Sequence, residues 1–346
     1  MVDRLVENPL EMASELHSWA KAHGLLINNV DAVEDIEALP QRKRILGSRV
    51  DAQSSLPIVF AHGMGDSCFN DGFRNLVKRS SNLMGGVYSV CVPTGKNQAE
   101  DTNNGYFLNM DASVEIFAAN IRKDPKLANG FHAIGLSQGN NVIRGYIAKH
   151  NYPPVHTFIS INGVNAGEGA VPYCRPSYKK PTITTTTKND VAFPSMCDLL
   201  MEQASRAAYT TYAQSHSFQA NYWRDPRESE FPTYQKYAQL AQWNNEGLVF
   251  NQTLKENYAR TSKFVWVLAT EDGMVWPKEG EQWGAPDPKN PFQHILPREE
   301  TAWFVQDLFG LRSAEEDGKN FYESFQGDHL RFSMKQYDEW LTKYLS

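Results

Sequence analysis

The stretch "AIGLSQGNN" (Ala133 to Asn141) places one serine, Ser137, between two glycines. A serine in the pattern G-x-S-x-G acts as a nucleophile where the chain turns sharply from a strand into a helix. Small residues at Gly135 and Gly139 permit the turn, which lifts the serine oxygen above the sheet. An apolar run precedes the motif and a helical pattern follows it. The motif therefore predicts a nucleophile elbow, and an ordinary loop serine is the alternative.

A serine hydroxyl is a weak nucleophile and needs a base, which follows it along the chain in this arrangement. His329 stands in "GDHLRFS", directly before the predicted C-terminal helix, where the base is expected. The alternative for His329 is a loop histidine that caps this helix. The other candidates flank a strand too soon after the serine, or lie in an aromatic-rich segment or a proline-bounded loop. They are His150, His156, His216 and His294.

The base needs a carboxylate that orients it, expected just past a late strand. Glu271 and Asp272 both follow the apolar run "FVWVLAT". Asp272 directly precedes Gly273, so a turn can expose its side chain, and we favour it. The sequence alone leaves Glu271 as an alternative.

Acyl transfer also needs hydrogen-bond donors for the developing oxyanion. One is expected from the backbone N–H after the nucleophile, at Gln138, and the other from an early strand–helix loop. The segment "HGMGDSC" (His62 to Cys68) matches that loop. Met64 is the candidate because glycines on both sides free its backbone to turn an N–H inward. His62 is expected to brace the loop rather than to perform chemistry.

Apolar runs alternate with amphipathic helical patterns after residue 55, which is typical of a mostly parallel sheet covered by helices. Strands are expected at 56–63, 87–93, 131–134, 156–163 and 264–270, and helices near 110–121, 140–147 and 333–346. The sequence predicts three parts: a helical extension at 1–55, for which a flexible arm is the alternative, a core formed by 56–164 and 261–346, and an aromatic-rich helical insertion at 165–260. The threonine run "PTITTTTKND" in the insertion is expected to be an exposed loop.

Composition excludes several classes of function. The 346 residues include 34 Lys and Arg against 40 Asp and Glu, a net charge of −6, which argues against general nucleic-acid binding and a polybasic membrane anchor. The longest apolar run near the start, "GLLI" (24–27), is too short for a signal peptide or a transmembrane segment, so we expect a soluble chain. No metal or cofactor is expected.

Four cysteines, Cys68, Cys91, Cys174 and Cys197, lack C-x-x-C spacing. They allow three connectivities for two bridges, and buried free thiols are the alternative.

Four motifs in order, "LPIVFAHGMGDSC", "DPKLANGFHAIGLSQG", "YWRDP" and "GDHL", resemble the palmitoyl-protein thioesterase family of the α/β-hydrolase fold. The similarity runs from Leu56 to the C-terminus. It implies hydrolysis of long-chain fatty acyl thioesters from S-acylated cysteine, in proteins or peptides, through an acyl-enzyme. It also implies a triad of Ser137, Asp272 and His329, oxyanion donors at Met64 and Gln138, and an insertion that forms a groove for the acyl chain.

The resemblance further implies a disulfide between Cys174 and Cys197, glycosylation at the sequon Asn251-Gln252-Thr253, and a lysosomal or other endomembrane compartment, although no signal peptide is visible. The chain departs from the family pattern at Asn140, where a third glycine is common, at Trp276, which replaces an acidic residue, and in a longer Cys174 to Cys197 loop. Two rival functions remain: a carboxylester lipase or esterase of the same fold, and a non-catalytic protein that binds lipid or a partner. The oligomeric state is not predicted.

Overall fold

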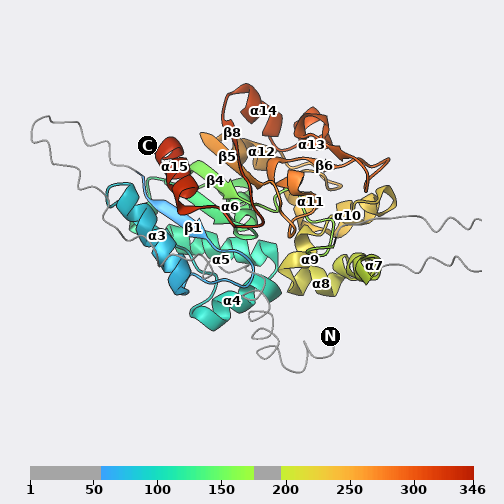
Figure 1. Cartoon of the computed structure of the whole chain (residues 1–346), viewed down its shortest axis with the longest axis horizontal. Helices are drawn as coiled ribbons and strands as arrows, with labels where there is room; N and C mark the ends of the chain where they lie inside the picture. Colours follow the sequence, from blue (N-terminus) through green and yellow to red (C-terminus); the bar gives the residue numbers. More distant parts are fainter. Residues whose placement is uncertain (1–55, 175–195) are drawn as a thin grey trace, which may run out of the picture.

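The computed structural model describes residues 56–174 and 196–346 (Figure 1). The helical extension expected over 1–55 and the exposed loop expected at 181–190 lie outside the described residues.

A six-stranded, wholly parallel sheet with strand order β2-β1-β3-β4-β5-β8 forms the centre of the described chain. Its strands are β1 (Ile58–Ala61), β2 (Ser89–Cys91), β3 (Phe131–Leu136), β4 (Val155–Ile161), β5 (Lys263–Ala269) and β8 (Asn320–Phe325). The predicted parallel sheet is confirmed. The edge strand β8 is not among the predicted strands, because its sequence "NFYESF" is mixed and most of it is only half-buried.

Helices cover both faces of the sheet, because alternate side chains of each buried strand point to opposite sides. Val59 and Ala61 of β1 join a core with α5 and α6, while Ile58 and Phe60 join a second core with α3 and α15. The helices of this part are α3 (Asp71–Leu83), α4 (Gln98–Phe107), α5 (Met110–Lys123), α6 (Gly139–Lys149) and α15 (Met334–Tyr344).

Side-chain caps explain where two of these helices begin. The Asn109 side chain accepts a hydrogen bond from the Ala112 N–H at the start of α5. Ser333 and Gln336 form a reciprocal capping box at the start of α15. Ser333 therefore caps α15, which begins directly after the loop that carries His329.

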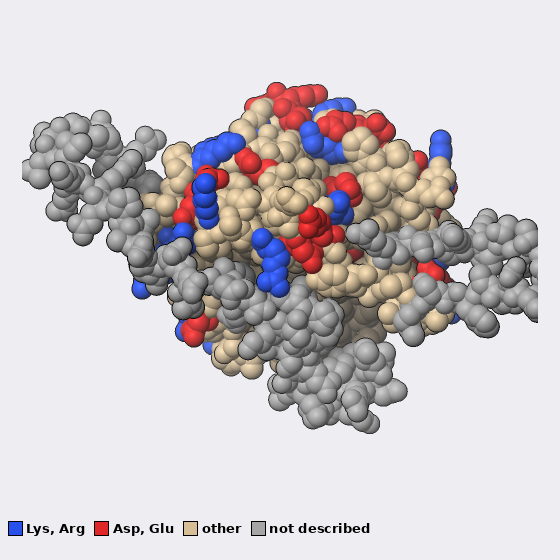
Figure 2. Space-filling model, in the orientation of Figure 1, with Lys and Arg blue, Asp and Glu red and all other residues tan. Residues whose placement is uncertain are grey.

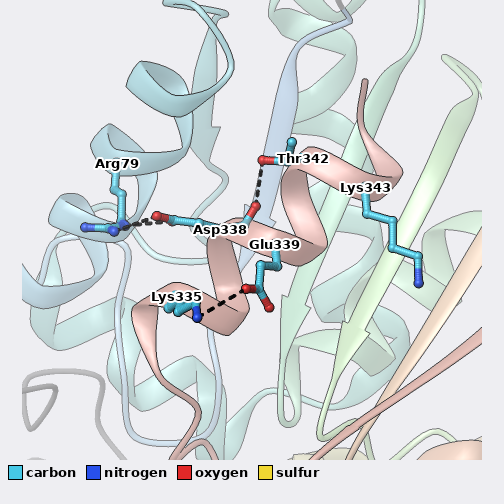
Figure 3. Close-up of a pocket in the computed structure, with 6 residues that line it drawn as sticks. All are labelled: Arg79, Lys335, Asp338, Glu339, Thr342 and Lys343. Carbon is cyan, nitrogen blue, oxygen red and sulfur yellow. Dashed lines mark hydrogen bonds and ion pairs between the residues drawn. The ribbon is translucent and has the colours of Figure 1, made fainter. Parts of the chain in front are cut away.

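Helices α3 and α15 lie side by side (Figure 1) and are linked by polar contacts. Arg79 donates two hydrogen bonds to Asp338, at 2.8 and 2.6 Å, and the hydroxyls of Ser80 and Tyr337 lie 2.7 Å apart. A surface groove of about 600 Å³ lies at this junction (Figure 3). Its lining residues are Arg79, Lys335, Asp338, Glu339, Thr342 and Lys343. The charged side chains of the groove all form ion pairs, and the pair between Arg79 and Asp338 joins the two helices.

Two long excursions leave the sheet at the carboxyl ends of β4 and β5. The first contains α7 (Met196–Ala208), α8 (Thr211–His216), α9 (Phe218–Tyr222), α10 (Phe231–Tyr237), α11 (Gln239–Trp243) and α12 (Gln252–Ala259). The second contains the 3₁₀ turn η4 (Lys278–Gln282), the strand pair β6 (Ala285–Pro286) and β7 (Ile295–Leu296), α13 (Ala302–Val305) and α14 (Leu311–Glu316). The second excursion is not among the sequence predictions. The division into core and insertion stays a prediction.

Acidic and basic side chains are interspersed on the face shown in Figure 2. Over the described ranges, no helix has both the length and the apolar character needed to cross a bilayer.

Candidate active site

Ser137 lies in the turn between β3 and α6, with a φ of 52°. This left-handed conformation is unfavourable for a residue with a side chain and is typical of functional turns. The Ser137 N–H donates to the Ile161 carbonyl at 2.9 Å, which anchors the turn to the end of β4. The structure therefore places Ser137 on the sharp strand-to-helix turn that the motif predicts.

Close packing explains both glycines of the motif. A Cβ at Gly139 would lie 2.5 Å from the carbonyl oxygen of His62, and one at Gly135 would lie 2.8 Å from the Cα of Asn140. Side chains at these positions would collide with backbone. The two glycines therefore let α6 start directly against the β1 loop.

Asn140, the departure from the family pattern, holds the turn together. Its side chain is fully buried, and its Nδ2 donates to the carbonyl oxygens of Ser137 and Ile161, each at 2.9 Å. The Asn140 side chain therefore anchors Ser137 to the end of β4. Where the family pattern has a glycine, this chain has an asparagine whose side chain donates two hydrogen bonds to the turn.

His329 bridges Ser137 and Asp272. Its Nε2 lies 2.8 Å from the Ser137 Oγ, and its Nδ1 lies 2.6 Å from the Asp272 Oδ2. His329 and Asp272 are both buried. With Nδ1–H donating to the carboxylate, Nε2 is free to accept the serine proton, which is the tautomer that base catalysis needs. Glu271, the alternative acid, is exposed and accepts a hydrogen bond from Gln326.

The Asp272 carboxylate is fixed by its own turn. Its Oδ1 accepts hydrogen bonds from the N–H groups of Met274 and Val275, both at 2.8 Å. Burial alone would raise the pKa of Asp272, but the neighbouring His329 and the hydrogen bonds hold the pKa below its usual range. The carboxylate is therefore ionised and aimed at Nδ1.

The remaining candidate histidines have contacts elsewhere. His150 lies 3.0 Å from Glu115, and His294 lies 3.2 Å from Asp287. The His216 ring stacks on Tyr212, whereas His156 lies edge-on to His132. The structure brings His329 to Ser137 and leaves these four at other places.

The loop after β1 is organised by a buried ion pair. His62 Nε2 lies 3.2 Å from Asp101 Oδ2 on α4. Burial disfavours the imidazolium, but Asp101 outweighs this effect and raises the pKa of His62 to about 9. His62 Nδ1–H then donates to the Gly63 carbonyl, 2.9 Å away. His62 braces this loop, as predicted.

This contact sets the direction of the Met64 N–H. In a trans peptide the C=O of Gly63 and the N–H of Met64 point in opposite directions. The Gly63 carbonyl faces His62 and also accepts from the Asp66 N–H at 3.3 Å, so the Met64 N–H faces away from both. A Cβ at Gly63 would lie 3.2 Å from the Ser137 Cβ, so this peptide lies against the serine.

Asp101 is a functional residue that sequence reasoning missed. Its carboxylate also accepts hydrogen bonds from the N–H groups of Cys68 and Thr94, at 2.9 and 2.7 Å. It lies in a polar helix, "QAEDTNNGYF", where nothing marks it apart from its neighbours. Only the folded chain shows that it joins the loop after β1 to the loop after β2.

Gln138 connects the elbow to two helices through its side chain. Its Nε2 donates to the Gly105 carbonyl on α4 at 2.7 Å, and its Oε1 accepts from Gln219 on α9 at 2.6 Å. The Tyr222 hydroxyl lies 3.3 Å from the same Oε1. Helix α9 of the first excursion therefore contacts the residue directly after Ser137.

Two disulfides flank these loops. Cys174 pairs with Cys197, as the resemblance implies, and Cys68 pairs with Cys91, a pairing that the sequence left open. The sulfur of Cys68, which lies near His62 and Asp101, is therefore not a thiolate available to a metal.

The Cys174 bridge lies close to the Asp272 turn. Tyr173 donates its N–H to the Gly273 carbonyl at 2.7 Å, and its ring packs on the Gly273 Cα. The backbone N–H of Trp276 donates to Glu168 at 2.8 Å, and its indole stacks on Phe292. The tryptophan that departs from the family pattern therefore packs beside this turn.

A parallel sheet whose central strand leads through a strained serine turn into a helix defines an α/β-hydrolase. The model of the palmitoyl protein thioesterase family matches residues 57–329. Palmitoyl-protein thioesterase 1 of Caenorhabditis elegans is 30% identical over 283 residues, which cover 81% of this chain and 88% of that protein. Palmitoyl-protein thioesterase 3 of Dictyostelium discoideum is 27% identical, with coverage of 81% and 87%.

Among solved structures, an extracellular α/β-hydrolase from a Paenibacillus species matches at a TM-score of 0.41 and 14% identity, covering 84% of this chain and 98% of that one. The chain belongs to the palmitoyl protein thioesterase family. It is a thioester hydrolase.

Proposed function

We propose that Ser137 is the nucleophile that cleaves long-chain acyl thioesters of cysteine, with His329 as base and Asp272 as the orienting acid. The observation that supports this assignment is the continuous contact from the Ser137 Oγ through the His329 ring to the Asp272 carboxylate. Ser137 Oγ attacks the thioester carbonyl carbon while its proton passes to His329 Nε2. The C–S bond then breaks, and the imidazolium returns the proton to the departing thiolate.

The resulting acyl-serine is hydrolysed by water. His329 takes a proton from the water, whose oxygen attacks the ester carbonyl, and returns that proton to Ser137 Oγ as the C–O bond breaks. Asp272 stays ionised throughout and stabilises the imidazolium in both halves of the reaction.

The oxyanion of each tetrahedral intermediate is proposed to accept hydrogen bonds from the backbone N–H groups of Met64 and Gln138. Neither N–H donates to another residue in the part of the chain that the structure describes. The orientation imposed on Met64 by the Gly63 carbonyl supports this role. Each such donor lowers the barrier by roughly 3 to 4 kcal/mol.

The acyl chain is proposed to run between the elbow and the helical excursion at 165–260. S-palmitoylated proteins or peptides are the proposed substrates, the class that the names of the related palmitoyl-protein thioesterases give. The contacts of Gln138 with α4 and α9 support this path, since both helices adjoin the reacting serine. Each buried methylene would contribute about 0.8 kcal/mol, so a sixteen-carbon chain would be preferred over an eight-carbon chain.

Hydrolysis of an S-palmitoylated peptide by the wild type, Ser137→Ala and Ser215→Ala tests the proposal. Ser215 is an exposed serine on α8 and serves as the matched control. We expect turnover to vanish in Ser137→Ala and to persist in Ser215→Ala. Faster cleavage of the matched oxoester would favour the carboxylesterase instead. A folded wild type that leaves both substrates intact and Ser137 unreactive toward a fluorophosphonate would favour a lipid- or partner-binding protein.

A further inference from the structure

A second buried carboxyl group, Glu281, lies behind the proposed triad. It belongs to the 3₁₀ turn η4 and is fully buried. Its Oε2 accepts hydrogen bonds from Asn162 Nδ2 at 2.8 Å and from the Ala269 N–H at 2.9 Å. No N–H or hydroxyl group of a described residue donates to its Oε1. One oxygen of Glu281 is thus held by donors, and the other has none.

Glu281 adjoins Asp272 and His329. A carboxylate oxygen of each acid and a ring nitrogen of His329 all lie within 4.8 Å of one another. Over residues 56–174 and 196–346, no lysine or arginine forms an ion pair with either acid. Two carboxylates this close in a buried site do not both ionise, because their repulsion is poorly screened.

The hydrogen bonds decide which acid keeps the proton. Asp272 accepts three N–H groups, two from backbone and one from His329, and all three favour its ionised form. Burial and the neighbouring Asp272 charge raise the pKa of Glu281 well above its usual range. The Glu281 carboxyl is therefore the neutral member of the pair.

We propose that Glu281 is a positioning residue that keeps its proton and donates it from Oε1 to the Asp272 carboxylate. Asp272 then has donors at all four of its lone-pair sites: two backbone N–H groups, the His329 ring and the Glu281 hydroxyl. The carboxylate cannot rotate away from His329 without losing one of these bonds. The inference rests on the proposed function of the triad.

Asn162 extends this arrangement to the loop of the base. Its Nδ2 donates to Glu281, while its Oδ1 accepts the Leu330 N–H, the residue after His329, at 3.0 Å. A continuous series of hydrogen bonds therefore runs from the Leu330 N–H through Asn162 and Glu281 to Asp272. These hydrogen bonds hold His329 and Asp272 in the orientation that stabilises the imidazolium.

Two other acids lie near the triad, and burial raises the pKa of one of them, Glu168, well above its usual range. Glu168 accepts the Trp276 and Ala170 N–H groups, and Asp328 accepts those of Gly273 and His329. Both remain present in any Glu281 variant, so a comparison of variants isolates the proton on Glu281.

Two substitutions separate the donor from the shape of the side chain. Glu281→Gln keeps an acceptor for Asn162 and places an amide N–H toward Asp272, so kcat should stay within about threefold of the wild type. Glu281→Met fills the space without a donor, and kcat should fall at least about tenfold with KM little changed. A kcat in Glu281→Gln as low as in Glu281→Met, or an unchanged kcat in Glu281→Met, would overturn the proposal.

The pH dependence of unfolding shows whether Glu281 is protonated in the folded chain, without a measurement of activity. The pKa of Glu281 is higher in the folded than in the unfolded chain. The contribution of the Glu281 carboxyl to the free energy of unfolding is therefore complete below about pH 4.5 and is lost as pH rises. The unfolding equilibrium constant of the wild type, relative to Glu281→Gln, should rise about tenfold per pH unit above pH 4.5. A ratio that is independent of pH would mean that Glu281 is ionised in the fold.

Glu246 provides the matched control, since it is a buried glutamate that pairs with Arg224 at 2.7 Å. Glu246→Gln removes an ion pair and should increase the unfolding constant at pH 7, whereas Glu281→Gln should not. If Glu281→Met does not fold, the ratio of the unfolding constants of the wild type and Glu281→Gln still shows whether Glu281 is protonated. If the Ser137 proposal fails, kcat loses its meaning but the unfolding ratio still reports where the proton lies, so the two failures are distinguishable.

Discussion

His62 and Asp101 form a buried ion pair in which the histidine also donates to the carbonyl of its own neighbour, Gly63. A single imidazolium thus joins α4 to the loop that follows β1. Because the Gly63 carbonyl is held on one side, the Met64 N–H points to the opposite side of the same peptide. Gly63 itself lies close to Ser137, since a Cβ there would be 3.2 Å from the Ser137 Cβ. The direction of a proposed oxyanion donor therefore depends on the charge of a residue that does no chemistry itself.

This ion pair predicts a loss of stability at alkaline pH. The pKa of His62 is raised from 6.5 to about 9 on folding, so its contribution is fully present below pH 6.5 and disappears as pH rises through 9. Relative to His62→Asn, the wild type should lose about 3 kcal/mol of unfolding free energy across this window. Urea unfolding at several pH values measures it. His294→Asn, at an exposed histidine, should track the wild type, and parallel curves for wild type and His62→Asn would contradict the assignment.

The elbow could be predicted from sequence because its determinants are local. Gly135, Ser137 and Gly139 lie within one turn of chain, and the strand and helix on either side have clear periodicity. Asp272 and His329 were predictable as well, because each follows a recognisable element and the order of the parts is restricted. The structure brings these residues together.

The supporting residues could not be predicted, because their partners are distant in sequence. Asp101 lies in a polar helix, and Glu281 lies in "KEGEQ", which has the composition of a solvent-exposed turn. Burial of a carboxyl group leaves no local signal. The edge strand β8 and the pairing of Cys68 with Cys91 depend in the same way on long-range contacts.

Asp272→Asn should leave the fold intact and strongly reduce turnover. An amide in place of the carboxylate no longer favours the Nδ1–H tautomer of His329, so kcat should fall roughly 10³- to 10⁴-fold. Glu271→Gln, at the exposed neighbouring acid, is the control and should retain kcat within twofold. Steady-state kinetics on a thioester substrate measure both. A larger loss of kcat in Glu271→Gln than in Asp272→Asn would exchange the roles that the contacts assign.

Asn140→Ala should destabilise the protein. It removes two hydrogen bonds and leaves the buried carbonyls of Ser137 and Ile161 with fewer donors, a loss of about 1 to 3 kcal/mol. Asn141→Ala is the comparison, since that buried side chain donates only one longer bond, at 3.3 Å to Val164. Denaturant midpoints should rank Asn140→Ala below Asn141→Ala. The reverse order would mean that Asn140 does not anchor the elbow.

Removing the Cys68–Cys91 disulfide should destabilise the chain about as much as removing the Cys174–Cys197 disulfide. Only the first removal is expected to lower kcat as well. Both bridges join residues 23 positions apart, so each restricts the unfolded chain comparably, by about 3 kcal/mol. The Cys68 N–H bonds to Asp101, so a Cys68→Ala, Cys91→Ala double variant should also lower kcat. Calorimetry and kinetics below the melting temperature separate the two effects. An unchanged kcat in this variant would show that the loop holds its shape through the ion pair alone.

Gly139→Ala should abolish folding or activity, because its Cβ would meet the backbone carbonyls of Ala61 and His62. Neither β1 nor α6 can retreat without breaking the sheet core, so we expect a loss above about 4 kcal/mol, the range of severe overpacking. Gly318→Ala is the matched control: its φ is +67° and a Cβ there meets open space, so only conformational strain of about 1 to 2 kcal/mol should follow. Denaturant unfolding and thioester turnover of both variants measure the difference. If Gly139→Ala were as stable as Gly318→Ala, the close approach of α6 to the β1 loop would be wrong, and with it the reason for the second glycine of the motif.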